Sequence, residues 1–316
     1  MKRAIPLILL LCFFITACSS GSDPQPDPGT PSKPSGSSSQ TSQSQKGSRD
    51  NTPNVLVPSA DGKSVEQSDV AVIDYSNASE GYLMVNYTGS NAKVKLQITG
   101  ADAVTYTYNL SGKGYETFPL TAGSGNYKVV VYENITGDEY AAVLSASISV
   151  ESGNEFGPYL YPSQYVNFTA SSLPIAKAKE LAYPANEDLD VISNVYNYII
   201  ANFTYDYDKA ANVQSGYLPD VDEIFTINTG ICFDYAAVMA TMLRSQRIPT
   251  RLEVGYKGEE YHAWISTYVK DVGWINGVIE FDGKDWKLMD PTFAATSSSP
   301  ESFTADDDSY ITKYVY

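Results

Sequence analysis

The segment Asn228-Thr229-Gly230-Ile231-Cys232-Phe233-Asp234-Tyr235-Ala236 places a cysteine at the start of a helical pattern. Pro249 lies beyond the end of the predicted helix, whose buried face is formed by Phe233, Ala236, Ala237, Ala240 and Leu243. Gly230 lets the backbone turn sharply before the helix. The Cys232 thiol would then lie at a helix N-terminus, where unpaired N–H groups and the helix dipole favour the thiolate. The segment therefore predicts a cysteine nucleophile, and the same N–H groups could stabilise an oxyanion.

The counts of cysteine and histidine support this interpretation, since the chain has three cysteines and one histidine. Cys12 and Cys18 lie in the N-terminal leader, so Cys232 is the one thiol expected in the folded region. A leftover thiol in a secreted chain indicates a reactive group or an intermolecular disulfide. The histidine is His262, in Tyr261-His262-Ala263-Trp264-Ile265, and its unperturbed pKa near neutrality suits a general base.

Asp290, in Leu288-Met289-Asp290-Pro291-Thr292, is the candidate for the third group, which orients the imidazole. It ends a strand that we expect to pair beside the histidine strand, and Pro291 stops the ladder there. Each residue alone has an ordinary structural interpretation: an inert buried thiol, a structural histidine and an Asp-Pro turn. Together, their order Cys, His, Asp and their places at element ends are typical of thiol enzymes.

Four separated blocks then resemble the transglutaminase-like core superfamily, in the order that this family shows. They are Gly-Ile-Cys-Phe-Asp-Tyr-Ala, Met-Leu-Arg-Ser-Gln-Arg-Ile-Pro-Thr-Arg, Tyr-His-Ala-Trp-Ile and Met-Asp-Pro-Thr, within residues 187–295. The helix that ends at Ala201-Asn202-Phe203-Thr204-Tyr205-Asp206 is also similar to the family's upstream helix. The sequence departs from the pattern at Gln246, where the family often has glycine, which affects a turn.

The resemblance implies that Cys232 is the nucleophile, His262 the base and Asp290 the orienting acid of an enzyme that forms a thioester. Water as acceptor gives peptidase-like or amidase-like hydrolysis, which we favour slightly, and an amine gives cross-linking. The alternative is a non-catalytic binding or adhesion protein that keeps the fold. We expect no cofactor and no metal, because the acidic run Asp306-Asp307-Asp308 lacks the ligand spacing of a calcium loop.

Residues 151–316 read as the α+β catalytic domain, papain-like and transglutaminase-like in class. Asn186 is a plausible N-cap for a helix whose apolar face is formed by Leu189, Ile192, Tyr196, Ile199 and Phe203. Asp282-Gly283 is a hairpin turn between the last two of the four strands that we expect after the cysteine helix. These strands are Arg251–Tyr256, His262–Val269, Val278–Phe281 and Trp286–Met289. Helices before antiparallel strands predict an α+β domain.

Residues 69–150 read as an all-β domain. Lys93-Val94-Lys95-Leu96-Gln97-Ile98-Thr99 alternates polar and apolar residues, which is typical of a half-buried strand. About seven short strands separated by turn clusters favour an immunoglobulin-like sandwich. The region has no cysteine or histidine, so we expect a spacer or accessory role. Its tyrosines either pack the sheets or form a binding face: Tyr106, Tyr108, Tyr115, Tyr127 and Tyr132.

Residues 1–17 read as a signal peptide, with Lys2 and Arg3 before the apolar run Ala4–Ile15, which is too short for a transmembrane helix. Ile15-Thr16-Ala17-Cys18 resembles a bacterial lipobox, which implies lipidation of Cys18. Residues 18–68 therefore begin with the lipidated cysteine. The rest of that range is rich in Ser, Pro and Gly and contains no aromatic residue, which predicts a disordered tether.

The net charge is −16, so we expect no nucleic-acid partner, because an acidic chain repels phosphate backbones. The leader and the lipobox predict an extracytoplasmic lipoprotein held at the membrane by its anchor. We expect its substrate to be a peptide or protein at the cell surface, and cell-wall peptides are one candidate.

Overall fold

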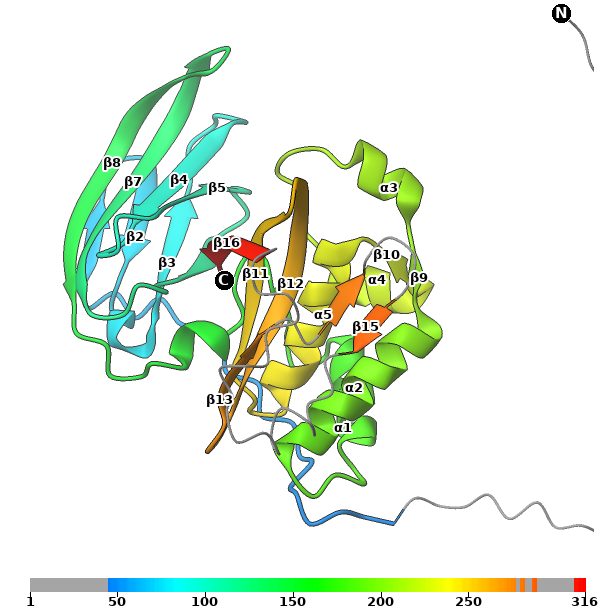
Figure 1. The fold of residues 1–316 in the computed structure, drawn as a ribbon. Coiled ribbons are helices and arrows are strands. Elements are labelled where there is room, and N and C mark those ends of the chain that lie inside the picture. Colours follow the sequence, from blue (N-terminus) through cyan, green and yellow to red (C-terminus); the bar gives the residue numbers. More distant parts are fainter. Residues whose placement is uncertain (1–44, 277–278, 282–285, 289–309) are drawn as a thin grey trace, which may run out of the picture. The chain divides into compact units, whose positions relative to one another are not determined.

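The computed structural model describes residues 45–276, 279–281, 286–288 and 310–316 (Figure 1). These residues belong to one compact unit, Ser44–Tyr316. Within them no helix is long enough and apolar enough to cross a membrane. The predicted signal peptide, with Cys12, and the lipidation site at Cys18 lie outside the described residues, so both stay predictions.

The first half of the described chain is built from two antiparallel sheets of four strands each, in the orders β1-β2-β3-β6 and β5-β4-β7-β8. The strands and the one short 3-10 helix among them are β1 (Val65–Gln67), β2 (Ala71–Asp74), η1 (Ala78–Glu80), β3 (Tyr82–Tyr87), β4 (Val94–Thr99), β5 (Thr105–Asn109), β6 (Tyr115–Pro119), β7 (Gly125–Thr136) and β8 (Glu139–Val150). The predicted β-structure of this region is confirmed. Its immunoglobulin-like character stays a prediction.

The alternation that predicted a half-buried strand is visible in β4. Its residues Val94, Leu96 and Ile98 are buried, whereas the residues between them are partly exposed. Residues of both sheets share one hydrophobic core, to which β3 contributes Leu83 and β7 contributes Val129. The period of two therefore orients each strand by burying one face.

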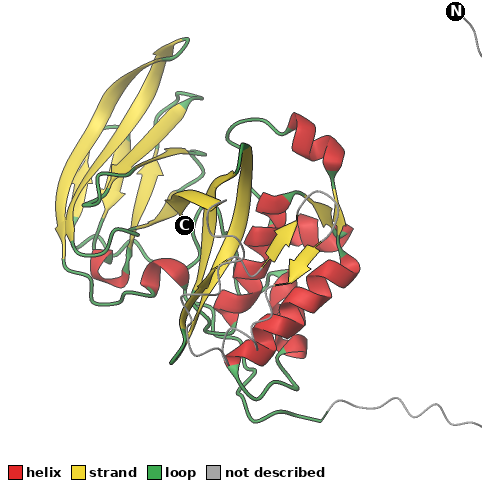
Figure 2. Cartoon of the chain, viewed as in Figure 1, coloured by secondary structure: helices red, strands yellow, loops and turns green. Residues whose placement is uncertain are grey.

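The second half is mixed α and β, as predicted. Its elements are η2 (Gly157–Tyr159), α1 (Leu173–Leu181), α2 (Asp188–Asn202), β9 (Thr204–Tyr205), α3 (Tyr207–Asn212), α4 (Val221–Ile227), β10 (Thr229–Gly230), α5 (Cys232–Ser245), β11 (Thr250–Lys257), β12 (Glu260–Val269), β13 (Gly273–Asn276), β14 (Ile279–Phe281), β15 (Trp286–Leu288) and β16 (Tyr310–Val315). An antiparallel sheet runs in the order β13-β12-β11-β16. Helix α5 packs against α1 and α2 and against strands β11 and β12 (Figure 2).

Helix α5 lies in the core, since every residue from Asp234 to Ser245 is buried. The predicted start at Cys232 is confirmed. For α2, the predicted N-cap Asn186 is wrong, because Glu187 is the residue with extended backbone before the first turn. Asp190 accepts hydrogen bonds from the N–H groups of both Asn186 and Glu187. The acidic first turn therefore stabilises the start of α2 one residue later than expected.

Residues 45–64, which we call the strap, correct the described part of the predicted tether, because residues 47–54 are bonded to the second half of the chain and residues 59–64 to the first half. The N–H of Gly47 donates to the Tyr183 carbonyl at 2.9 Å, and that of Asn54 donates to the Ser245 carbonyl at 2.8 Å. Arg49 forms an ion pair with Asp188 at 2.7 Å. The prediction weighed only apolar burial, whereas the strap is held mainly by hydrogen bonds of its backbone and arginine.

The turn after α5 explains how the strap is held at its middle. Gln246 is fully buried, and its side chain donates to the Asn51 carbonyl and accepts from Arg49. Arg247, at φ 66°, has the left-handed conformation of this turn, and its guanidinium donates to the main chain of the strap at Asp50 and Thr52. The departure from the family pattern at Gln246 thus coincides with the attachment of the strap.

Candidate active site

Cys232 is the first residue of α5 and is half-buried. The residue before it, Ile231, has extended backbone, with φ −102° and ψ 176°. The approach to the helix is fixed by a short parallel pairing of β10 with β9, in which the N–H of Asp206 donates to the Gly230 carbonyl at 2.8 Å. The N–H groups of a first helical turn have no acceptor within the helix, so the thiol lies beside main-chain donors.

Position 230 requires glycine because another side chain lies close to its Cα, and not because its backbone has a conformation that favours glycine. A Cβ at this position would lie 2.7 Å from the Asp234 Cβ and 2.8 Å from its Oδ2. The φ of Gly230 is not among the positive values of the structure. The predicted role of this glycine therefore changes: its missing side chain makes room for the Asp234 carboxylate under the cysteine turn.

Asp234 is a fully buried carboxylate that organises this turn, and sequence reasoning missed it. Its Oδ2 accepts from the Ile231 N–H at 2.9 Å and from the Lys209 Nζ at 2.6 Å. Its Oδ1 accepts from the Tyr217 hydroxyl at 2.6 Å. Burial, followed by the hydrogen bond to Asp234, raises the pKa of Tyr217 well above its usual value. The carboxylate is thus compensated on both oxygens, as a buried charge must be.

A weak signal for Asp234 was present in the sequence, because an acidic residue at the third position of a helix often bonds the N-cap N–H. The sequence carried no signal for the two side chains that bond to Asp234. Lys209 lies in α3, a helix without a buried residue, and Tyr217 lies in the loop after it. Their meeting at Asp234 depends on how the chain between α2 and α4 folds back over the start of α5.

His262 lies in β12, opposite Gly255 of β11, and is 7% exposed. Its ring is stacked with that of Trp264, at 6.3 Å between centroids and 19° between planes. Because α5 packs against β12, the structure packs together the two elements that carry the predicted nucleophile and base. Gly255 allows β16 to lie close, since a Cβ there would meet the Ile311 carbonyl oxygen at 2.0 Å.

A second buried carboxylate that we did not predict lies on the same sheet as His262. Glu253 is 6% exposed and accepts hydrogen bonds from the Ser266 hydroxyl at 2.6 Å and the Thr312 hydroxyl at 2.9 Å. These two bonds join β11 to both of its neighbours, β12 and β16. Glu253 therefore adds side-chain hydrogen bonds to the backbone pairing that holds the histidine strand in the sheet.

Asp290 lies outside the described residues, so its role as the orienting acid stays a prediction. The strand before it, β15, pairs with β14 in the part of the chain that the structure describes. There β12 pairs with β11 and β13, so the expected pairing of the Asp290 strand beside the histidine strand is not found. Among the same residues, no group of three or more His, Cys, Asp and Glu side chains could hold a metal ion.

Residues 175–277 match the family model of the transglutaminase-like superfamily. This range contains Cys232 and His262 and ends before Asp290. The resemblance predicted from the four sequence blocks is confirmed, and the chain carries a transglutaminase-like domain over these residues. The match begins inside α1 and covers the helices α2 to α5 and the strands that pack against α5.

A curated relative is the uncharacterized protein YebA of Bacillus subtilis (strain 168), which is 22% identical over 227 residues. The match covers 63% of this chain but only 28% of the length of YebA. Two solved structures are similar at low TM-scores. A candidate cysteine protease from Cytophaga hutchinsonii is 18% identical over 67% of each chain, with a TM-score of 0.34. The periplasmic domain of TgpA from Pseudomonas aeruginosa is 16% identical over 69% of this chain and 75% of its own, with a TM-score of 0.32.

Proposed function

We propose that this protein is a cysteine acyl-transfer enzyme that attacks peptide or protein amides through a thioester on Cys232. The observation that carries the proposal is the place of Cys232 as first residue of a buried helix, inside the segment that matches the transglutaminase-like superfamily. The packing of that helix on the His262 strand supports it, since a thiol nucleophile needs a base within reach.

In the proposed reaction, His262 takes the thiol proton and the sulfur of Cys232 attacks the carbonyl carbon of the amide. The C–S bond forms and the C–N bond breaks, and the amine leaves with the proton that the imidazolium returns. Helix N–H groups stabilise the oxyanion of the tetrahedral intermediate. Asp290 orients the imidazole. Water, deprotonated by the imidazole, then cleaves the thioester and restores the thiol; an amine acceptor would give cross-linking.

We propose that this reaction takes place outside the cytoplasm, at the membrane surface, and that a lipid on Cys18 anchors the protein there. The support is the leader sequence and the lipobox-like Ile15-Thr16-Ala17-Cys18. A Cys18→Ser protein expressed in a bacterial host should move from the membrane fraction to the soluble fraction. If the variant stays with the membrane, another segment holds the protein there.

We also propose that the two N-terminal sheets form an immunoglobulin-like sandwich. Their orders β2-β3-β6 and β5-β4-β7-β8 correspond to the orders A-B-E and C′-C-F-G of that fold. Buried residues from both sheets in one core support this arrangement. A protein that ends at residue 150 should give the circular dichroism spectrum of an all-β domain and should unfold cooperatively if the proposal is right.

The function is tested on the thiol itself. Incubation with peptide pools should leave an acyl adduct on Cys232, detected by intact mass and absent from a Cys232→Ser protein. Iodoacetamide should alkylate Cys232 quickly at mildly acidic pH, and His262→Ala should slow the reaction, because the imidazolium partner is lost. Asp290→Asn should change alkylation less than turnover. Alkylation that rises only above about pH 8 in all three proteins would indicate an ordinary thiol and favour a non-catalytic binding protein.

A further inference from the structure

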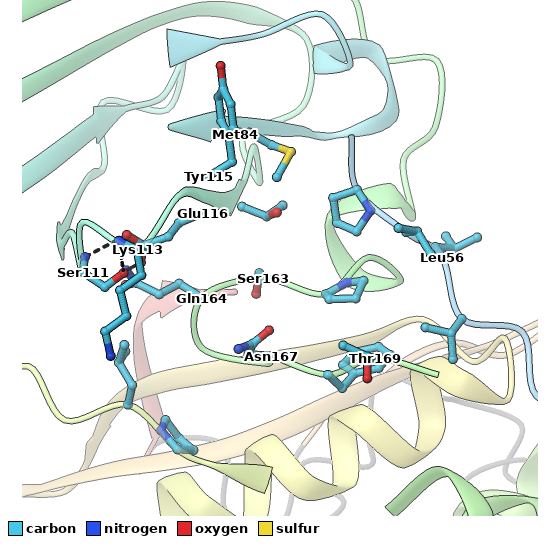
Figure 3. A pocket seen from close by; sticks show the side chains of 18 of the residues that line it. Leu56, Met84, Ser111, Lys113, Tyr115, Glu116, Ser163, Gln164, Asn167 and Thr169 are labelled. Carbon is cyan, nitrogen blue, oxygen red and sulfur yellow. Dashed lines mark hydrogen bonds between the residues drawn. The ribbon is translucent and has the colours of Figure 1, made fainter. Parts of the chain in front are cut away.

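A pocket of about 510 Å³ lies beside β6, and its unpaired polar atoms are closed to an occupant (Figure 3). Strand β6, the loop of residues 162–170 and strap residues 55–58 supply most of its lining. Ser163 Oγ and Gln164 Oε1 have no partner among the described residues, but both are buried in the wall. The polar groups of this pocket therefore do not indicate a ligand.

Another pocket, of about 610 Å³, lies where the loop between β6 and β7 meets the second half of the chain. Its lining comes from residues 120–124, from the segment 152–159, and from the side chains of Arg251 in β11 and Trp274 in β13. None of these residues belongs to the catalytic machinery proposed above. A site here is therefore independent of the proposed function.

The Arg251 guanidinium lies in the corner between two aromatic rings of this pocket. Its Cζ is 3.7 Å from the ring centroid of Trp274 and 4.9 Å from that of Tyr159. The two rings meet edge to face, with 5.2 Å between centroids and 83° between planes. Cation–π attraction of this kind holds a guanidinium in place without using its hydrogen-bond donors. The arginine is thus preorganised for a further partner.

The charge of Arg251 is not compensated by a carboxylate. Among the described residues, no Asp or Glu side chain forms an ion pair with it. Glu253 lies two positions on along β11, but its oxygens accept from the hydroxyls of Ser266 and Thr312. Glu155, the acidic residue of the described lining, is exposed. Because a partly buried charge is costly without a counter-charge, Arg251 indicates a site for an anion.

The terminal nitrogens of Arg251 are the atoms that a ligand can reach. The Nε is buried, whereas neither Nη atom is among the buried unpaired atoms of the described residues. Their one polar neighbour there is the Tyr159 hydroxyl. Burial raises the pKa of Tyr159, and the charge of Arg251 offsets part of that rise. At least one Nη atom is therefore open to solvent, in agreement with the partial exposure of Arg251.

The opposite wall adds a hydroxyl. Ser124 is exposed, and its Oγ accepts from the Ser152 N–H at 3.0 Å, so its own proton is available to a ligand. A guanidinium fork matches the two oxygens of a carboxylate. One arginine beside the acidic Glu155 suits a monoanion better than a phosphate dianion. The volume of the pocket exceeds that of an inorganic ion, so the anion belongs to a larger molecule.

We propose that this pocket binds an organic carboxylate, which the Nη atoms of Arg251 and the hydroxyl of Ser124 hold while the body of the ligand lies against Phe156. The terminal carboxylate of a short peptide and the carboxylate of an acidic sugar both supply this group. Since Ser124 lies in the loop before β7 and Arg251 in β11, the ligand contacts both halves of the chain.

The test follows the indole N–H signal of Trp274 in the full-length protein, because this ring contacts Arg251; Trp274→Phe assigns the signal. One pair of probes is acetyl-alanyl-alanine with a free carboxylate and the same dipeptide as its C-terminal amide. The other pair is glucuronate and its methyl ester. We expect at least one acid to shift the signal saturably and its neutral form to leave it unchanged. The acid that binds identifies the source of the carboxylate.

Two variants locate the binding. Arg251→Gln should weaken binding of that acid at least about tenfold, while Lys128→Gln, which removes an exposed cation of β7 outside the pocket, should not change it. Ser124→Trp fills the pocket from its exposed wall with Arg251 intact and should have an effect of similar size. The exposed Asn126→Trp in β7 is its control. Ser124→Trp decides the matter if Arg251→Gln does not fold.

Four outcomes would overturn the proposal. They are no saturable shift with either acid, equal shifts from an acid and its neutral form, tighter binding of inorganic phosphate than of either acid, and unchanged affinity in a folded Arg251→Gln or Ser124→Trp protein. The last outcome would show that Arg251 serves only to pack against Trp274 and Tyr159.

Discussion

The two ends of helix α5 each bury a charged side chain, and they compensate it differently. At the N-terminal end, Asp234 is paired with the Lys209 ammonium and the Tyr217 hydroxyl. At the C-terminal end, Arg244 is 1% exposed and no Asp or Glu side chain pairs with it among the described residues. Burial lowers the pKa of its guanidinium. Its hydrogen bonds go to main-chain oxygens only, those of Tyr161, Thr250 and Tyr316.

The difference shows that one helix serves two purposes. The partners of Asp234 lie 17 and 25 positions upstream, in the segment that folds over the cysteine, so this network shapes the site. The acceptors of Arg244 include main chain 83 and 72 positions away, so this residue joins the loop after η2 to β11 and to the end of the chain beside β16. We therefore expect changes at Arg244 to affect folding and changes at Asp234 to affect the site as well.

The largest effect is expected from Arg244→Met, which removes all of these hydrogen bonds. Buried carbonyls would lose their donors, so the free energy of unfolding should fall by about 3–5 kcal/mol. Arg244→Lys keeps a charge but not the planar set of donors and should cost less. Urea unfolding measures both. A loss below about 1 kcal/mol for the methionine variant would mean that the carbonyls find other donors.

Asp234→Asn should have the next largest effect, about 2–3 kcal/mol of stability, because it leaves the Lys209 ammonium without its counter-charge. A double-mutant cycle with Lys209→Met should recover about 1–3 kcal/mol of coupling. The alkylation rate of Cys232 should also change, since the Ile231 N–H loses its charged acceptor. The exposed Asp208→Asn in the first turn of α3 serves as the matched control and should cost at most about 1 kcal/mol.

Gly230→Ala isolates the steric part of the N-terminal arrangement. The new Cβ would lie 2.7 Å from the Asp234 Cβ, so the carboxylate must shift away from the Ile231 N–H. We expect a loss of about 1–3 kcal/mol. At Gly153 the nearest atom to a built Cβ is 3.6 Å away, so Gly153→Ala should leave stability nearly unchanged. Equal melting temperatures for the two variants would contradict the close-approach explanation.

The smallest effect is expected where a buried polar atom has no partner among the described residues, at the Tyr196 hydroxyl of α2. Burial raises the pKa of Tyr196 from 10.0 to about 12. The folded protein therefore keeps this proton where the unfolded chain loses it, so stability falls as pH rises from 10 toward 12. Tyr196→Phe should be neutral or stabilising by up to about 1 kcal/mol and should reduce this alkaline loss.

Urea unfolding at pH 8 and at pH 11 measures this difference. The exposed Tyr183→Phe is its matched control and should not change stability at neutral pH. A Tyr196→Phe protein that is clearly less stable than the parent would show that the hydroxyl does have a partner. Tyr196 would then be a third buried polar side chain, after Asp234 and Arg244, that is compensated by a hydrogen-bond partner.

Local patterns predicted much of the fold and the two described members of the candidate site. The alternation in residues 93–99 matches β4, and the helical spacing after Cys232 matches α5 from its first residue. Periodicity succeeds in these places because each element buries one face or is buried throughout. It did not predict β16 (Tyr310–Val315) or the bonding of the strap, because both are held by partners distant in sequence.

The tyrosines of the first half also show that local sequence patterns do not predict contacts with distant residues. Tyr106 and Tyr108 are buried and contact the ring of Tyr316, whereas Tyr115 is 44% exposed and lines the pocket beside β6. Both of the roles that the sequence left open therefore occur, packing for the first two and an accessible surface for the third. The choice between them depends on which strand lies at the edge of a sheet.

The sequence by itself determined the element types, the cysteine at a helix start, the single histidine on a strand and the likeness to the transglutaminase-like superfamily, because all of these are written in local spacing and residue type. Only the tertiary structure decided that Asp234 is compensated by Lys209 and Tyr217, that Arg244 bonds main chain alone, and that residues 45–64 are held. It also decided that β6 and the 162–170 loop enclose a pocket. Compensation of a buried charge depends on which distant groups the folded chain brings within hydrogen-bond distance, and no local pattern encodes that.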